Sequence, residues 1–278
     1  MTVNNAAQNM PKNMFGEICI GILTYNRPDY LKRLFDSEAF QASIKKHQAH
    51  VFVMAHAANA ETRKYLAELK RDAKFTLSTW VSWQDLDLVT TRVRLCDQII
   101  GAGLEPNDVL LFIDDDALVT DAAWIDNYLA PFDDALVGIV GQEAFDVNVG
   151  WEFFHPPAIV PGEADVTSSS VMAMRGAVLL GGCEFDLIFG PVWHEDSDFC
   201  LQARNAGWKV WGLDRKTTGV VHESYRRTMD VIFQRNLEFL SGKWAGKGLI
   251  KLEQEETPPP SPLPVHREGE SIREVADG

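Results

Sequence analysis

The stretch that decides the fold is Val109-Leu110-Leu111-Phe112-Ile113-Asp114-Asp115-Asp116. Its unbroken apolar run is typical of a strand that is buried on both faces, as in a parallel sheet. The three carboxylates follow where this strand ends. Because alternate positions of a strand point to the same side, Asp114 and Asp116 can share one hard cation while Asp115 faces elsewhere. The stretch therefore predicts a divalent metal site, and the alternative is an acidic turn that caps the next helix.

Composition and charge limit the class of protein. The chain has 278 residues and is 46% hydrophobic, which suits one large domain or two closely packed ones. Its formal net charge of -14 disfavours anionic membranes and nucleic acids, including a nucleic-acid acceptor, because both are bound through Lys and Arg. The four cysteines lie far apart in apolar contexts, as buried thiols in a reducing compartment do. Without a signal-peptide pattern or an apolar run of membrane-spanning length, we expect a soluble, cytoplasmic protein.

Strands alternate with amphipathic helices along the first half of the chain. Apolar runs predict strands at 17–24, 51–54, 79–83 and 109–113, and a segment with helical spacing follows each of the first three. Asn26 is expected to cap the first helix and Pro28 to lie in its first turn. This order predicts a doubly wound α/β sheet, whose ligands gather beyond the carboxyl ends of the strands. The turn at 24–27 and the acidic triplet both lie at that edge.

The second half has a less regular pattern. Strands are predicted at 137–140, 171–174 and 209–213, one helix opens at 193–198, and another carries Met229 to Leu240. The acids that open the first of these helices are equally explained by compensation of the helix dipole. The aromatic segment 151–155 is either a platform for a sugar or a loop packed onto the core. From about Lys251, a proline cluster and scattered charges predict a disordered tail over 251–278, and residues 1–14 are expected to be flexible.

Several of these segments, in this order, resemble the motifs of GT-A glycosyltransferases, most closely those of glycosyltransferase family two. They are Thr24-Tyr25-Asn26-Arg27-Pro28, Phe112-Ile113-Asp114-Asp115-Asp116, Phe185-Asp186, His194-Glu195-Asp196 and His222. The resemblance covers about Phe15 to Trp244. It implies the GT-A fold, a doubly wound mixed sheet flanked by helices, as one domain over 15–250. The nucleotide-binding half would be about 15–118 and the acceptor-binding half about 119–250.

The resemblance also implies an activity and a cofactor. The activity is transfer of a sugar from a nucleotide-diphosphate sugar to an acceptor hydroxyl, with Mn²⁺ or Mg²⁺ bridging the donor to the DXD motif. A cation is needed because a diphosphate beside unshielded carboxylates would be repelled. By resemblance, Asp116 is a direct metal ligand, and Asp114 acts through water or on the donor ribose. His222 would be a third metal contact, although a lone His after an apolar pair is more often structural.

Further residues are assigned to the donor by the same resemblance. The donor set is Thr24, Tyr25, Asn26, Arg27, Asn59, Arg92, Asp114, Asp115 and Arg226. Arg226 and its neighbours Tyr225 and Arg227 would fold over the diphosphate, since Arg suits bidentate phosphate contacts. Family-two enzymes place an acid after the second strand to read the nucleobase, whereas 54–59 contains none, so Asn59, His56 or Asp85 would substitute. A UDP-sugar is the family's commonest donor, and a GDP-sugar is the alternative.

The acceptor hydroxyl needs a general base within hydrogen-bonding reach. In inverting relatives the acid of the Glu-Asp motif has this role, which implies Asp196 as the base and Glu195 as an orienting residue. Trp193, His194 and Trp151 would flank the acceptor, which could be a sugar, a glycan, a lipid-linked sugar or another hydroxyl compound. In a retaining enzyme Asp196 would instead bind donor or acceptor, and the sequence leaves both mechanisms open.

Three other classes of protein share parts of this pattern. A haloacid dehalogenase phosphatase needs Thr or Val four positions after its first Asp, where this chain has Leu118. A sugar nucleotidyltransferase needs a Gly-rich loop after the first strand, and 24–29 contains no Gly. A non-catalytic carbohydrate- or nucleotide-sugar-binding protein would keep the fold without the chemistry. The intact acidic triplet and Asp196 favour an enzyme over this last class.

Overall fold

The computed structural model describes residues 15–142, 144–147, 151, 153–154, 161–222 and 230–247. The predictions for the N-terminus at 1–14, for the tail at 251–278 and for Tyr225, Arg226 and Arg227 lie outside these residues. Within the described part, no helix is both long enough and apolar enough to cross a membrane.

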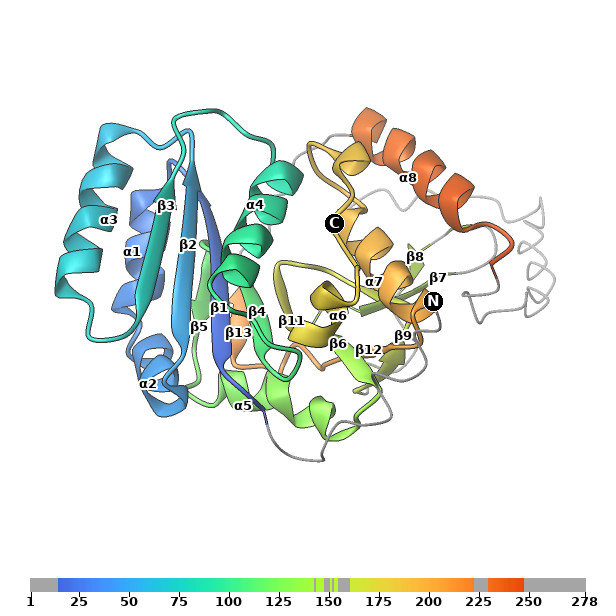
Figure 1. Ribbon diagram of the computed structural model, residues 1–278, viewed down its shortest axis with the longest axis horizontal. Coiled ribbons are helices and arrows are strands. Elements are labelled where there is room, and N and C mark those ends of the chain that lie inside the picture. The colour runs from blue at the N-terminus through green and yellow to red at the C-terminus, as the bar shows by residue number, and fades with distance from the viewer. Residues whose placement is uncertain are drawn as a thin grey trace, which may run out of the picture.

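An eight-stranded mixed sheet forms the centre of the molecule (Figure 1). Its strand order is β3-β2-β1-β4-β11-β6-β12-β9. The strands are β1 (Ile18–Tyr25), β2 (His50–His56), β3 (Leu77–Val81), β4 (Val109–Asp114), β6 (Val137–Gly141), β9 (Gly162–Ala164), β11 (Val171–Arg175) and β12 (Lys209–Gly212). The strands β3, β2, β1 and β4 run parallel to one another, whereas β11 is antiparallel to both of its neighbours, β4 and β6. The predicted doubly wound mixed sheet is confirmed.

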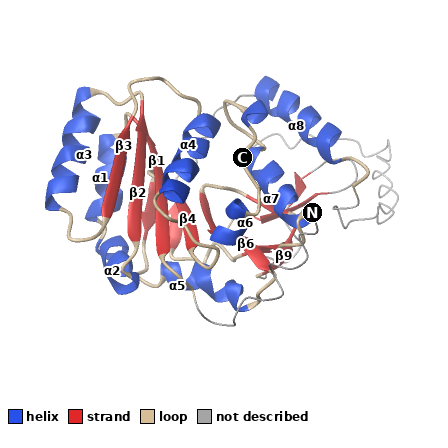
Figure 2. Ribbon diagram, viewed as in Figure 1, coloured by secondary structure: helices blue, strands red, loops and turns tan. Residues whose placement is uncertain are grey.

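Helices cover both faces of this sheet (Figure 2). They are α1 (Pro28–Asp36), α2 (Glu38–His47), α3 (Ala60–Asp72), α4 (Leu88–Gly101), α5 (Trp124–Leu129), α6 (Gly176–Leu180), α7 (Glu195–Asn205) and α8 (Asp230–Trp244). Two 3-10 turns, η3 (Ala130–Asp133) and η4 (Leu187–Phe189), join them. The remaining strands are short: β5 (Ala117–Val119) pairs with β13 (Val220–His222), and β7 (Ala144–Val147) lies between β8 (Phe153–Phe154) and β10 (Val166–Thr167).

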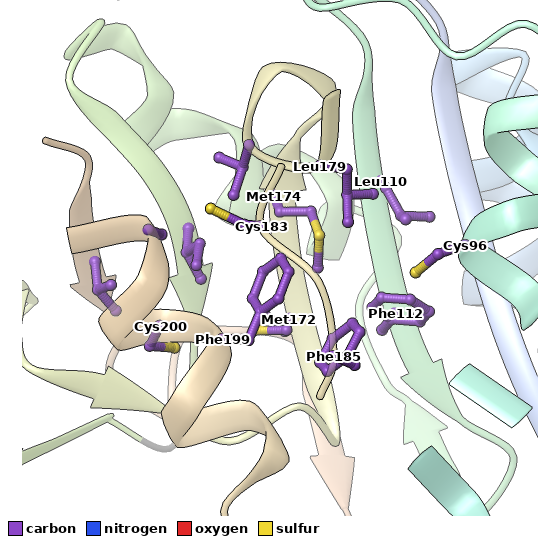
Figure 3. Close-up of a cluster of buried hydrophobic side chains, with 14 of the residues drawn as sticks. Cys96, Leu110, Phe112, Met172, Met174, Leu179, Cys183, Phe185, Phe199 and Cys200 are labelled. Carbon is purple, nitrogen blue, oxygen red and sulfur yellow. The ribbon is translucent and has the colours of Figure 1, made fainter. Parts of the chain in front are cut away.

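Alternation along the buried strands divides the hydrophobic core into two clusters, one on each face of the sheet. On one face, Ile20, Ile22 and Leu111 pack with the apolar sides of α1, α2 and α5. On the other face, Leu110 and Phe112 pack with residues of α4, α6, α7 and α8. Figure 3 shows this second cluster, in which the ring of Phe185 lies edge-on to Phe112 and stacks on Phe199 at 4.5 Å.

The cysteines belong to this packing. All four of them are free and buried, as the sequence predicts. Burial raises the pKa of the Cys96 thiol to about 12, so it stays protonated and behaves as a small apolar side chain.

Two local predictions were wrong. Asn26 does not cap α1, because its φ of 48° places it in the left-handed region and its side chain accepts the N–H of Asn59 at 2.7 Å instead. The first helical position is Pro28, as expected. The strand predicted at 79–83 ends at Val81. Beyond it, the carbonyls of Ser82 and Gln84 accept the N–H groups of Ala58 and Ala57 in the loop after β2, in place of regular strand pairing.

Candidate active site

The acidic triplet lies at the carboxyl edge of the parallel strands, as predicted. The register of the β1–β4 pair places Asp114 beside Leu23, so the turn that follows β1 meets the acids directly. Asp114 is half-buried, while Asp115 and Asp116 are buried. The side chain of Asp115 is 0% exposed. It shares the guanidinium of Arg27 with Asp116, and the expectation that it faces away from the other two acids remains a prediction.

The turn residue Arg27 contacts two of these acids with its single positive charge. Its guanidinium forms an ion pair with Asp115 and donates a hydrogen bond of 3.0 Å to Oδ2 of Asp116. Arg33 of α1 donates to the backbone carbonyl of Asp116 at 3.1 Å. Burial raises the pKa of Asp115 to about 7, although Arg27 and the Thr24 hydroxyl pull it down. The acidic edge therefore carries a built-in counter-charge from the turn at 24–27.

The chemistry of this edge fits a divalent cation. Carboxylate oxygens are the ligands that Mg²⁺ and Mn²⁺ prefer. The β5–β13 pair places the backbone of His222 opposite Ala117, the residue after Asp116. Its role as a metal ligand remains a prediction. The side chain of His222 lies outside the described part. Among the side chains that are described, no three of His, Cys, Asp and Glu gather into a metal-binding group. The guanidinium of Arg27 forms ion pairs with Asp115 and Asp116 at this edge.

The rest of the turn contacts the loop after β2. The ring of Tyr25 lies 4.9 Å from that of His56, and burial lowers the pKa of this histidine although Asp85 raises it. Asn59 uses its side-chain oxygen to cap α3, accepting the N–H of Thr62 at 2.8 Å. The donor contacts expected of Tyr25, Asn26 and Asn59 remain predictions.

A serine segment joins the acidic edge to the start of α7. The N–H of Asp114 donates to the carbonyl of Ser170 at 2.9 Å, continuing the antiparallel β4–β11 pair by one residue. The adjacent Ser169 donates its N–H to Oδ2 of Asp196 at 3.0 Å and its hydroxyl to the same oxygen at 3.3 Å. Asp196 is half-buried at the first turn of α7. The predicted base and the predicted metal ligands are thus neighbours in space through residues that sequence reasoning missed.

Glu195 has a different environment from Asp196. It is 3% exposed and accepts a hydrogen bond of 2.7 Å at Oε1 from Arg92, which is 1% exposed. Burial and the nearby Asp196 raise the pKa of Glu195 to about 7, against the effect of Arg92. The expectation that Arg92 contacts donor phosphate remains a prediction, and the partner observed is this carboxylate. Because Arg92 belongs to α4 and Glu195 to α7, the pair ties the two halves of the molecule together.

The predicted acceptor residues lie around the same helix start. Trp193 is 37% exposed, and His194 is buried with its ring 4.5 Å from that of Phe233 in α8. Burial lowers the pKa of His194, although the nearby Asp196 opposes this. Trp151 is half-buried and packs against the core cluster that contains Leu110 and Phe112. This contact favours the alternative that the segment covers the core. Most of 152–160 lies outside the described residues.

Two further residues fix the loop that carries Trp193. The side-chain amide of Asn236 donates to the carbonyls of Phe189, Val192 and Trp193 at 2.7 to 2.9 Å. The carboxylate of Asp198 in α7 accepts hydrogen bonds from Nζ of Lys243 and from the indole N–H of Trp244, both in α8. Sequence reasoning treated Asp198 as one acid of a helix start and gave Asn236 no role. No local signal marks either residue, because their partners lie far away in the chain.

Comparison with solved structures identifies the architecture. The GalNAc-T7 structure with UDP, GalNAc and Mn²⁺ is similar at a TM-score of 0.62 and 12% identity, over 82% of this chain and 48% of the other. The TarS 1-349 structure from S. aureus with UDP-GlcNAc is similar at a TM-score of 0.61 and 16% identity, over 86% and 68%. The PcManGT mannosyltransferase from Pyrobaculum calidifontis with GDP-Man and Mn²⁺ is similar at a TM-score of 0.58 and 12% identity. The match covers 81% of this chain and 64% of the other. The chain has the GT-A glycosyltransferase fold.

The GT-A chain spans about half to two thirds of the length of these structures. No protein-family model and no curated protein matches its sequence. The fold expected from the motifs is confirmed, and the narrower assignment to family two remains a prediction.

Proposed function

We propose that this protein is a metal-dependent glycosyltransferase that moves a sugar from a nucleotide-diphosphate sugar to an acceptor hydroxyl. The observation that carries the proposal is the serine segment at 168–170, which bonds to Asp114 on one side and to Asp196 on the other. The chain segment that pairs with the backbone of Asp114 therefore also holds the carboxylate of the candidate base. The similarity to structures that contain GDP-Man or UDP-GlcNAc supports a nucleotide-sugar donor, whose nucleobase could be guanine or uracil.

In this proposal Asp114, Asp116 and His222 hold Mn²⁺ or Mg²⁺. When bound, the ion offsets the negative charge that develops on the departing nucleoside diphosphate. Asp196 accepts the proton of the acceptor hydroxyl in an inverting transfer, and its bonds from Ser169 orient the carboxylate for this role. Glu195, locked to Arg92, fixes the first turn of α7. Trp193 and His194 flank the acceptor.

The proposal is tested by donor hydrolysis. The full chain is incubated with UDP- and GDP-sugars and Mn²⁺, and the released nucleoside diphosphate is measured. We expect release from at least one donor, none in excess chelator, and nearly complete loss in Asp116→Ala. Asp121→Ala is the control, because Asp121 is an exposed acid that only caps a turn.

A second function, nucleotide-sugar binding without catalysis, is favoured by one observation. Arg27 already places a guanidinium at the acidic edge, and a guanidinium can contact a diphosphate without a metal. Binding of a UDP- or GDP-sugar that persists undiminished in excess chelator, with no nucleotide released, would support this alternative and contradict the metal-dependent transferase.

A further inference from the structure

Arg27 contacts the one carboxylate that a metal would need most directly. Its Nη1 lies 3.0 Å from Oδ2 of Asp116, while its other terminal nitrogen binds Asp115. A carboxylate oxygen that accepts a guanidinium N–H at this distance presents that lone pair to arginine rather than to a cation. The carboxylate of Asp116 has further lone pairs, so the competition between arginine and a divalent ion at this residue is electrostatic: a positive charge already beside Asp116 opposes the arrival of a second one.

The backbone beneath Arg27 is fixed, whereas its side chain has room to move. Asn26, in the left-handed region, is anchored to Asn59, and Pro28 begins α1 directly afterwards. The Arg27 side chain itself is 38% exposed, and its guanidinium lies 5.4 Å from the centre of the half-exposed Tyr30 ring. An arginine that served only to neutralise the buried Asp115 would need neither this exposure nor the contact with Asp116. The geometry suits a side chain that can release one acid while it keeps the other.

We infer that Arg27 is a cation switch: it occupies Asp116 in the empty enzyme and leaves that carboxylate for the donor diphosphate when the divalent ion binds. The inference rests on the proposed function, because it assumes a metal at Asp116. Without the ion, the guanidinium prevents two adjacent carboxylates from repelling each other. With ion and donor present, the same guanidinium reaches an anionic diphosphate, a better partner than a carboxylate already shared with a cation. Metal binding and donor binding are then coupled through one side chain.

The test measures metal affinity in the absence of turnover. Mn²⁺ binding to the full chain is titrated by calorimetry or by the electron paramagnetic resonance signal of free Mn²⁺, with and without UDP or GDP. The variants are Arg27→Met, Arg27→Lys and Asp116→Asn. Arg63→Met is the matched control, because Arg63 is a partly buried arginine that lies over Trp83, away from the acids. Melting temperatures are recorded for each variant.

Removing the competitor should tighten the binding of Mn²⁺ alone. We expect Arg27→Met to bind Mn²⁺ about 10-fold more tightly than wild type, the effect of removing one close positive charge from a partly exposed site. Nucleoside diphosphate should strengthen Mn²⁺ binding in wild type and do so less in Arg27→Met, because the linkage between the two ligands is reciprocal. Arg27→Lys cannot bridge both acids, so its affinity for Mn²⁺ should lie between those of wild type and Arg27→Met. It also provides a test if Arg27→Met fails to fold.

The outcomes separate this inference from the proposed function. Equal or weaker Mn²⁺ binding by both Arg27 variants, with binding still abolished in Asp116→Asn, would overturn the switch and leave the metal site in place. Failure of every protein to bind Mn²⁺ at an Asp116-dependent site, with or without nucleotide, would overturn both. A tenfold gain in Arg63→Met would show a general effect of charge and would also overturn the switch.

Discussion

At the scale of single residues, the adjacent acids Glu195 and Asp196 have different surroundings. Asp196 is half-buried and oriented by Ser169, whereas Glu195 is buried against Arg92 with a pKa raised to about 7. The two acids therefore differ in burial and in hydrogen-bonding partners, which supports the different roles proposed for them. Both assignments lead to measurements.

Replacing Asp196 by Asn tests the base. The change preserves size but removes the ability to accept a proton, so kcat should fall by about 10² to 10⁴-fold while donor affinity changes little. Steady-state kinetics and donor titration measure both quantities. If Asp196 only stabilises α7, the variant should instead lose about 1 kcal/mol of stability and keep near-normal kcat. A large loss of kcat with a product of retained anomeric configuration would keep the residue essential and refute the inverting mechanism.

Replacing Glu195 by Gln tests its pKa. A folded-state pKa of about 7, above the ordinary 4.5, means that burial favours the protonated acid. This contribution to stability is complete below the ordinary value and is lost as the pH rises through the folded value. Wild type should therefore lose stability relative to Glu195→Gln between pH about 4.5 and 7. Urea unfolding of both proteins across this range measures the difference, and a pH-independent difference would contradict the prediction. The raised pKa of Asp115 is common to both proteins and cancels.

At the scale of elements, α8 is held to α7 and to the loop that follows η4 by a few polar anchors. Asp198 is 0% exposed and bonds at 2.6 to 2.9 Å to Lys243, Trp244 and Gln202. The side-chain amide of Asn236 in α8 donates to three backbone carbonyls of η4 and the loop that follows it. Because Trp193 and His194 lie on the anchored loop, the position of α8 determines the position of the candidate acceptor site.

Removing the anchor at Asp198 should loosen this whole unit. Asp198→Ala leaves the buried indole N–H of Trp244 without its acceptor, whereas Lys243 keeps Asp186 and Gln202 keeps the carbonyl of Glu184. We therefore expect a loss of about 1–3 kcal/mol in the free energy of unfolding. Asp186→Ala is the matched control, because Asp186 binds the same Lys243 but is half-exposed and should cost less than about 1 kcal/mol. Urea denaturation of the two variants gives the comparison. Equal losses would mean that the burial of Asp198 contributes nothing.

At the scale of the whole molecule, two core clusters on opposite faces of one sheet hold the chain together. Their last described member along the sequence is Trp244 of α8. The charged and proline-rich sequence after about Lys251 contributes little apolar surface to bury.

A chain that ends at Ile250 should therefore melt within about 2 °C of the full-length protein, since 1 kcal/mol corresponds to about 2–4 °C at this size. A chain that ends at Leu240 is the contrasting control. It lacks Lys243 and Trp244, and we expect it to melt well below both. Differential scanning calorimetry makes the comparison. If the Ile250 chain melts as low as the Leu240 chain, the tail is part of the folded core.

The sequence by itself determined the elements and the edge where they place the chemistry. Periodicity of apolar residues is a local property, so strands, helices and the acidic end of β4 could be read from it. The tertiary structure decided which side chains meet. The contact between Arg27 and Asp115 joins residues 88 apart, and that between Arg92 and Glu195 joins residues 103 apart. The antiparallel pairing of β11 with β4 brings Ser170 to the backbone of Asp114, and the adjacent Ser169 bonds to Asp196. Such pairings depend on how distant elements pack, because burial selects partners that no local pattern encodes.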